Sequence, residues 1–102
     1  LRWCHAHAPA ATVFLGTPPH ATRNPAMSNC GYADQAEAGA RFVRRVAQET
    51  GDVLIDLAKC PAFCAENEAV MQPNDGLHFS AVGYELLAQN VEAALRDHLK
   101  CD

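Results

Sequence analysis

The sequence predicts an α/β fold, because short apolar runs alternate with longer stretches of helical periodicity. Two apolar runs, residues 11–16 and 53–57, flank an amphipathic stretch at residues 34–50. A second amphipathic stretch follows at residues 80–99. This alternation of strand and helix is the order in which parallel sheets are built.

The two apolar runs have the composition of buried strands. Residues 11–16 (Ala-Thr-Val-Phe-Leu-Gly) and 53–57 (Val-Leu-Ile-Asp-Leu) show no regular alternation of apolar and polar side chains. Such runs indicate strands covered on both faces, as in parallel sheets flanked by helices. A His-rich helix tail, residues 1–8, precedes the first strand, and a long loop, residues 17–31, follows it. Loops of that length are more often functional than idle.

Both amphipathic stretches carry the signals of helices. Asp34 suits the first turn of the first helix and Gly51 its C-terminal stop, while Ser80 is a good N-cap for the second. Residues 65–71 predict a short helix between them. Apolar residues three or four apart should face the core. In the first stretch these are Ala36, Ala40, Val43 and Ala47, with Phe42 and Val46 widening the stripe, and in the second Leu87, Val91, Ala94 and Leu95 share one face with His98.

Two parallel strands do not form a stable sheet alone, because each requires neighbours along its edges. We therefore expect further strands N-terminal to Leu1, in a longer gene product or in a separate partner chain. On this interpretation residues 1–102 are the C-terminal portion of a single domain, and the upstream half of that domain is their partner.

Composition excludes some classes of partner. The chain has 102 residues, 49% of them hydrophobic and 20% charged, with a formal net charge of -4. Nucleic acids and anionic membranes require clustered Lys and Arg, which an acidic chain with scattered basic residues does not offer. No apolar run approaches the roughly 20 residues needed to cross a bilayer. We expect neither a nucleic acid partner nor a membrane span.

The cysteines favour free thiols in a reducing compartment such as the cytoplasm, because their number is odd and their spacing irregular. A Cys60–Cys64 disulfide stays an alternative for a secreted protein. Structural zinc normally uses two closely spaced ligand pairs. The cluster of Cys4, His5 and His7, together with the more widely spaced Cys60 and Cys64, does not match that pattern. We predict no metal and no cofactor, with a zinc-stabilised domain as the alternative. The five cysteines are Cys4, Cys30, Cys60, Cys64 and Cys101.

The sharpest local feature is Asp75-Gly76-Leu77-His78, on the turn that enters the last helix. A carboxylate three residues before a histidine can accept its ring N–H, fix its tautomer and stabilise the imidazolium. Gly76 allows the turn to close. The other ring nitrogen could then face a cleft beyond the carboxyl ends of the strands, where such sheets bind ligands. By itself the pattern also fits a helix start in which Asp caps and His packs.

This motif resembles that of a known family. Residues 75–84, Asp-Gly-Leu-His-Phe-Ser-Ala-Val-Gly-Tyr, resemble the C-terminal motif of the SGNH, or GDSL-type, esterases and lipases, and are most similar to the isoamyl acetate-hydrolysing esterase group. Residues 13–19 resemble that group's strand ending in a Thr-Pro-Pro turn. Residues 53–57 resemble its strand ending in Ile-Asp-Leu. The resemblance covers most of the chain in the right order.

The resemblance implies a partial three-layer α/β/α SGNH-hydrolase fold with parallel strands, and hydrolysis of carboxylic esters of small molecules. Asp75 would be the orienting carboxylate and His78 the general base. The family's nucleophilic serine, in a Gly-Asp-Ser motif, and its oxyanion glycine and asparagine have no counterpart here, and Asn74 does not match that asparagine. Without a nucleophile and oxyanion donors, the 102-residue piece should be inactive by itself.

Neither serine of the chain is expected to replace the missing nucleophile. Ser80 is better explained as the helix cap and lies too close along the backbone to His78, and no nucleophile-elbow motif surrounds Ser28. The alternative function is a non-catalytic α/β interaction module, including a degenerate relative that has lost its nucleophile.

Overall fold

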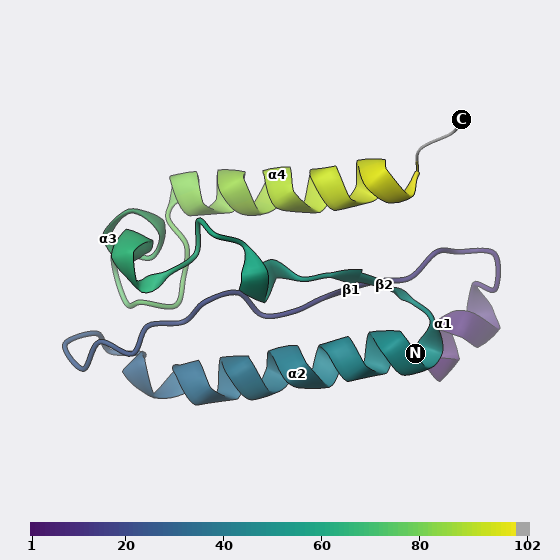
Figure 1. The fold of residues 1–102 in the computed structure, drawn as a ribbon, viewed down its shortest axis with the longest axis horizontal. Coiled ribbons are helices and arrows are strands. Elements are labelled where there is room, and N and C mark those ends of the chain that lie inside the picture. The colour runs from purple at the N-terminus through teal and green to yellow at the C-terminus, as the bar shows by residue number, and fades with distance from the viewer. Residues whose placement is uncertain (100–102) are drawn as a thin grey trace.

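The computed structural model describes residues 1–99 and confirms the α/β class (Figure 1). Short 3₁₀ turns lie at Cys30–Tyr32, Leu57–Lys59 and Ala65–Asn67. The helices and strands follow the predicted order: α1 (Arg2–His7), β1 (Phe14–Gly16), α2 (Ala33–Thr50), β2 (Val53–Ile55), α3 (Glu68–Met71) and α4 (Ala81–His98).

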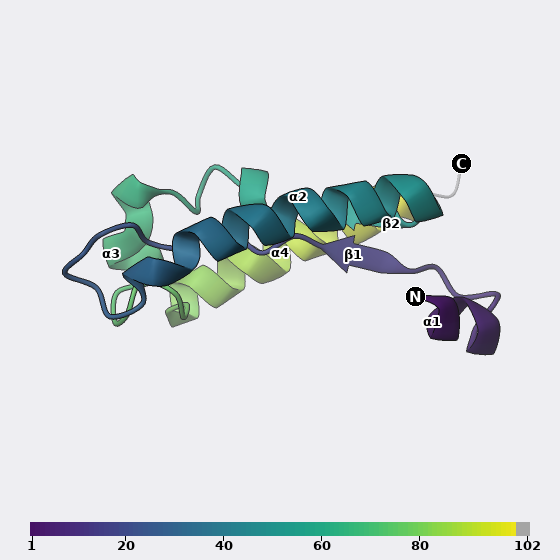
Figure 2. The ribbon, with the colours of Figure 1, turned by 90° about the horizontal axis from the view of Figure 1, so that it is seen from below.

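The two strands pair in parallel, with Leu15 opposite Leu54 in the centre of the register. They lie between α2 on one face and α4 on the other, as two perpendicular views show (Figures 1 and 2). Both strands are shorter than predicted. The first begins at Phe14 rather than at residue 11, and the second ends at Ile55, because Leu57 already starts a 3₁₀ turn.

The prediction that both strands are buried on both faces is wrong for this chain. Of β1 and β2, only Ile55 is buried; Phe14, Leu15, Val53 and Leu54 are half-buried. Within residues 1–99 the sheet has two strands, so one long edge of each has no partner strand. Apolar side chains at an open edge stay in partial contact with solvent.

The fold is fragment-like. The radius of gyration is 15.2 Å, whereas a compact domain of this length has about 13 Å. The accessible surface is 6824 Å², whereas a compact monomer of this mass exposes about 5,600 Å². A small core of Cys60, Phe63 and Met71 packs beneath the start of α4. The layers are present, but much of the surface that a complete domain would cover is open.

Helix α2 buries a stripe of alanines along one face. Ala33, Ala40 and Ala47 are buried and lie seven residues apart, which places them on one face. The expectation that Phe42 belongs to this face is wrong: Phe42 is 58% exposed, because two residues beyond Ala40 is about 200° around the helix. The helix ends as predicted at Gly51, whose φ of 76° is left-handed.

Helix α4 begins at the predicted cap. The Ser80 hydroxyl accepts a hydrogen bond from the Gly83 amide at 3.1 Å and donates one to the Val70 carbonyl at 2.6 Å. The expected apolar face is half-buried at Leu87, Val91, Ala94 and Leu95. His98 is exposed, and its ring meets the ring of Phe14 edge-on with 5.3 Å between centroids.

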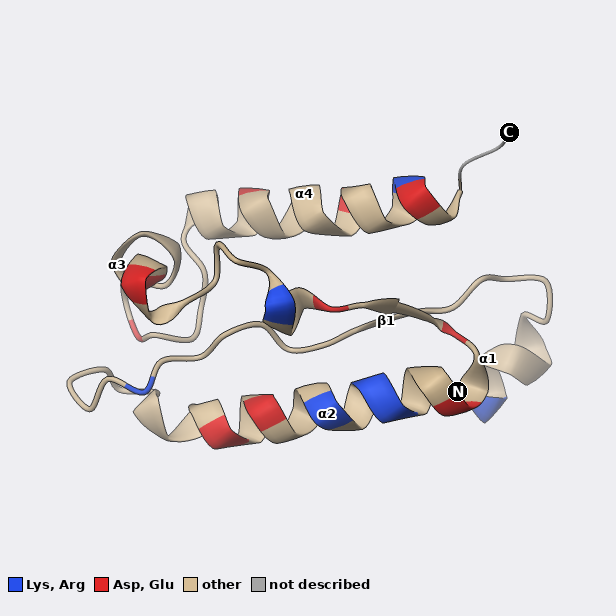
Figure 3. Cartoon of the chain, viewed as in Figure 1, with Lys and Arg blue, Asp and Glu red and all other residues tan. Residues whose placement is uncertain are grey.

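Along α2, Asp34 and Glu37 come first and the basic residues Arg41, Arg44 and Arg45 follow, so acidic and basic residues form separate groups (Figure 3). Among residues 1–99, no helix has the length and apolarity required to cross a bilayer. Cys4, Cys30, Cys60 and Cys64 are free thiols, and Cys101 lies outside the described residues.

Asp56 connects α2 to the end of the sheet. Arg44 donates to both of its carboxylate oxygens, at 2.8 and 3.0 Å, and the hydroxyl of buried Thr17 donates to it at 3.0 Å. The hydrogen bonds from Arg44 hold the pKa of Asp56 below its ordinary value of 3.8 despite partial burial. Asp56 therefore joins helix, strand end and following turn through one carboxylate.

Replacing Asp56 by Asn should lower the free energy of unfolding of the complete protein by about 2 kcal/mol, because charge-assisted hydrogen bonds are lost from a half-buried site. Because the pKa of Asp56 is lower in the folded state than its ordinary value of 3.8, the ionised carboxylate stabilises the fold above that pH. The difference in stability between wild type and variant should therefore shrink as the pH falls below about 3.8. Urea denaturation measures both effects. Exposed Asp97→Asn, the matched control, should change stability by less than about 0.5 kcal/mol, and an equal effect at the two sites would refute the assignment.

Candidate active site

The structure brings Asp75 and His78 together on the turn before α4. The Nδ1 atom of His78 and the Oδ2 atom of Asp75 are 2.5 Å apart. The other carboxylate oxygen, Oδ1, accepts backbone N–H groups from Leu77 at 2.9 Å and from His78 at 2.8 Å. One carboxylate thus folds the turn and orients the ring that the turn carries.

These contacts keep Asp75 ionised. The hydrogen bond from the His78 side chain, followed by those from the His78 and Leu77 amides, lowers the pKa of Asp75 from 3.8 to about 2. Because an ionised carboxylate only accepts hydrogen bonds, Nδ1 of His78 must be the donor. In the neutral ring, Nε2 then holds the free lone pair, which is the state required of a general base.

The imidazole is open to its surroundings. The His78 side chain is 71% exposed, and within residues 1–99 no group hydrogen-bonds its Nε2 atom. The turn lies beyond the carboxyl ends of β1 and β2, beside the loop that follows β1 (Figure 1). Open α/β sheets bind their ligands at this end. The arrangement can accept a proton from a hydroxyl presented there.

Gly76 allows a close approach between this turn and the long loop. Its φ is 75°, a left-handed backbone conformation that residues with a side chain rarely adopt. A Cβ atom there would lie 2.1 Å from Cγ2 of Thr22. The Thr22 amide also donates to the Gly76 carbonyl at 2.9 Å. The sequence indicated a glycine for turn closure, and the structure adds the contact that excludes any other residue.

Sequence reasoning missed the polar residues that surround the turn. Thr22 and Gln72 are completely buried, and the Glu68 carboxylate binds both the Thr22 hydroxyl and the His20 ring, each at 2.6 Å. Their partners lie more than 40 residues apart in the sequence. No local pattern connects residues so far apart.

The two serines are placed as expected. Ser80 is occupied by the helix cap, with its hydroxyl donating to the Val70 carbonyl and accepting from Gly83. Ser28 is exposed on the long loop, and among the described residues it makes no hydrogen bond to His78. Neither forms the serine–histidine contact that activates a nucleophile.

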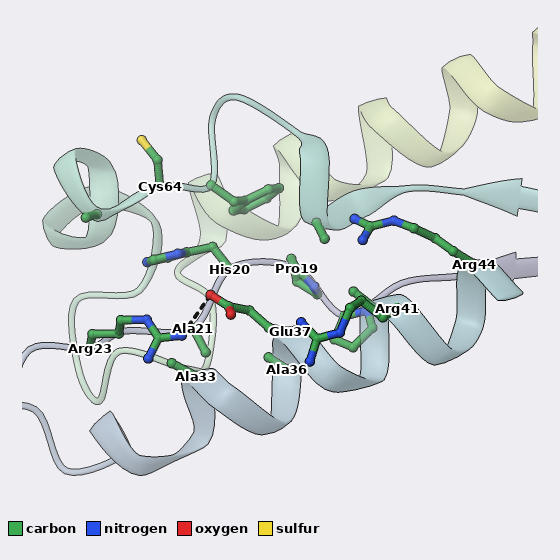
Figure 4. Close-up of a pocket in the computed structure, with 15 residues that line it drawn as sticks. Pro19, His20, Ala21, Arg23, Ala33, Ala36, Glu37, Arg41, Arg44 and Cys64 are labelled. Carbon is green, nitrogen blue, oxygen red and sulfur yellow. Dashed lines mark hydrogen bonds and ion pairs between the residues drawn. The ribbon is translucent and has the colours of Figure 1, made fainter.

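A cavity of about 450 Å³ lies elsewhere, between α2, the Pro18–Pro19 turn and the segment around Cys64 (Figure 4). Its walls include Arg23, which pairs with Glu37 at 2.7 Å, and Arg44, which pairs with Asp56. Neither Asp75 nor His78 lines it. This cavity is therefore separate from the candidate catalytic pair.

The candidate metal ligands do not gather. Among residues 1–99, no group of three His, Cys, Asp or Glu side chains has the geometry to hold a metal ion. His5 instead pairs with Asp52 at 3.0 Å, and the ring of His7 stacks on Trp3.

Comparison with known proteins identifies the type of fold. No protein-family model matches the chain, and no curated protein matches its sequence. Among solved structures, it is similar to the esterase domain of the ZfL2-1 ORF1 protein from the zebrafish ZfL2-1 retrotransposon, with a TM-score of 0.68 and 22% identity. The chain has an esterase-like α/β fold. The similarity covers 94% of this chain but 52% of the other, so the chain spans about half the length of that domain.

Replacing Gly76 by Ala should destabilise the complete protein by about 3 kcal/mol, the sum of left-handed strain and a clash with Thr22. Gly51 has nearly the same φ, but a Cβ atom there would meet nothing within 4 Å. Gly51→Ala should therefore cost only about 1 kcal/mol. Chemical denaturation of both variants separates strain from clash, and equal losses would contradict the close contact.

The titration of Asp75 reports on its bond to His78. Carboxyl ¹³C NMR of the complete protein should show the Asp75 resonance titrating near pH 2. In His78→Ala the midpoint should rise toward 3.8, because the largest of the interactions that lower the pKa is removed. His7→Ala should leave it in place. A midpoint near 3.8 in the wild type would show that the two side chains are not engaged.

Proposed function

We propose that this chain supplies the base and its orienting carboxylate to a serine ester hydrolase. The observation that carries the proposal is the Asp75–His78 contact, with Nδ1 engaged at 2.5 Å and the Nε2 side open. His78 takes the proton of a hydroxyl nucleophile and returns it to the leaving alcohol. Asp75 keeps the ring in the required tautomer and stabilises the imidazolium that forms between these steps.

The proposed type is the SGNH, or GDSL-type, esterase, within the isoamyl acetate-hydrolysing group, with a small-molecule ester as the substrate. Residues 75–84, 13–19 and 53–57 support this assignment through their resemblance to that group. The placement of the strands between α2 and α4 agrees with a three-layer architecture. The esterase domain with a similar fold supports the class of reaction.

The nucleophilic serine and the oxyanion donors come, in this proposal, from an upstream half of the same domain. Three properties of the chain support such a half: the unpaired edges of its two-stranded sheet, its excess accessible surface, and the exposure of His78. The excess is about 1,200 Å², more than the roughly 800 Å² that one partner buries in a standard interface. The missing half would close the active site over His78 and extend the sheet.

In the complete protein, Asp75→Asn should lower kcat for p-nitrophenyl acetate about 10³- to 10⁴-fold, and His78→Ala by at least as much, because the base loses its tautomer or is removed. Stopped-assay and spectrophotometric rates on the purified variants measure this. Asp97→Asn and His7→Ala are the matched controls and should retain wild-type turnover. KM should change little, since neither side chain is proposed to bind the ground state.

Near-normal turnover in either Asp75→Asn or His78→Ala would contradict the roles proposed for these residues as orienting carboxylate and base. If the complete protein lacks esterase activity and an upstream Gly-Asp-Ser segment, the chain belongs to a non-catalytic α/β module with this fold.

A further inference from the structure

We propose that Thr22 is a positioning residue for the Asp75–His78 pair, acting through a partly buried polar clamp that fixes the turn between them. The clamp consists of Thr22, Asn29, Glu68 and Gln72. Its effect on turnover depends on the proposed ester hydrolysis, whereas its effect on the geometry of the turn does not. None of its members hydrogen-bonds the His78 ring in the described structure, so they act through the backbone that carries it.

Three consecutive carbonyl groups of the turn are each held by the clamp. The Asp75 carbonyl accepts from the Asn29 amide at 3.3 Å, and the Gly76 carbonyl accepts from the Thr22 amide at 2.9 Å. The Leu77 carbonyl accepts from Nε2 of Gln72 at 3.3 Å. With Oδ1 of Asp75 bonded to the amides of Leu77 and His78, the turn has little freedom to move.

Thr22 is the residue on which the clamp depends. It is fully buried, its hydroxyl donates to Glu68 at 2.6 Å, and the same oxygen accepts from the Asn24 amide at 3.0 Å. Its methyl group occupies the space that a Cβ on Gly76 would need. Thr22 therefore holds its own loop in place with its hydroxyl and holds the turn with its amide and methyl group.

Glu68 and Gln72 connect the loop to α3. Burial raises the pKa of Glu68, but hydrogen bonds from Thr22 and His20 outweigh burial and leave the pKa below its ordinary value. Glu68 is therefore an ionised acceptor at neutral pH, which gives strong hydrogen bonds. Gln72 is also fully buried and donates to the His20 carbonyl at 2.6 Å as well as to Leu77. A single amide thus links the loop and the turn.

The chain contains a matched counterpart of Thr22. Thr17 is as deeply buried, its hydroxyl donates to the Asp56 carboxylate at 3.0 Å, and it accepts from the Ala58 amide at 2.9 Å. Chemistry and burial are the same, but the described structure gives Thr17 no hydrogen bond to residues 75–78. A comparison of the two threonines separates loss of stability from loss of positioning.

The test uses Thr22→Val and Thr17→Val in the complete protein, with Thr22→Ser as the conservative variant. Thr22→Val should lower kcat for p-nitrophenyl acetate about tenfold or more with KM within about twofold, as for other supporting residues around a reactive group. The NMR titration midpoint of Asp75 should rise from about 2 toward 3.8. Thr17→Val should lower the melting temperature to a similar extent but leave both readouts unchanged, and Thr22→Ser should restore both.

Each outcome decides the question. If Thr22→Val melts earlier but keeps wild-type kcat and an unchanged Asp75 titration, Thr22 is merely structural and the proposal is overturned. If Thr22→Val does not fold, Glu68→Gln replaces it, with the same decrease in kcat and the same rise in the Asp75 midpoint expected. If the wild type shows no ester hydrolysis but Thr22→Val still shifts the Asp75 titration, the positioning stands and the proposed function fails.

Discussion

The candidate site depends on the carboxylate of Asp75, which satisfies three N–H groups within three residues. Two of them are backbone amides of the turn, at 2.8 and 2.9 Å, and the third is Nδ1 of His78. Because the same carboxylate shapes the backbone and orients the ring, the position of the imidazole follows from the fold of the turn. The left-handed Gly76 makes that fold possible, and the contact with Thr22 excludes larger residues there.

Around this turn the chain is well ordered by polar contacts, although its sheet is incomplete. Half-buried carboxylates form two junctions: Asp56 with Arg44 and Thr17, and Glu68 with His20 and Thr22. The strands remain half-buried, and the surface is larger than a compact monomer of this size presents. The chain thus combines closely hydrogen-bonded loops with a two-stranded sheet whose apolar side chains are mostly half-buried.

The sequence pattern was sufficient to predict the order of helices and strands, because each element depends on contacts between residues close in the chain. The spacing of Ala40 and Ala47, the stop at Gly51 and the cap at Ser80 each act within a turn or two of helix, and each is confirmed. The pairing of Asp75 with His78 could also be predicted, since the two residues are three positions apart in the sequence. The prediction that Phe42 faces the core was wrong, because the width of an apolar stripe does not indicate which of its edges packs against the sheet.

The sequence by itself determined the α/β class, the helix ends and the Asp75–His78 pair, since all three follow from interactions between residues close in the chain. Only the tertiary structure decided what surrounds the turn. Thr22, Glu68 and Gln72 meet because a parallel pairing and a long loop bring distant segments together, with partners 46 and 52 residues apart. Contacts of that separation depend on how the whole chain packs, and no local periodicity records them.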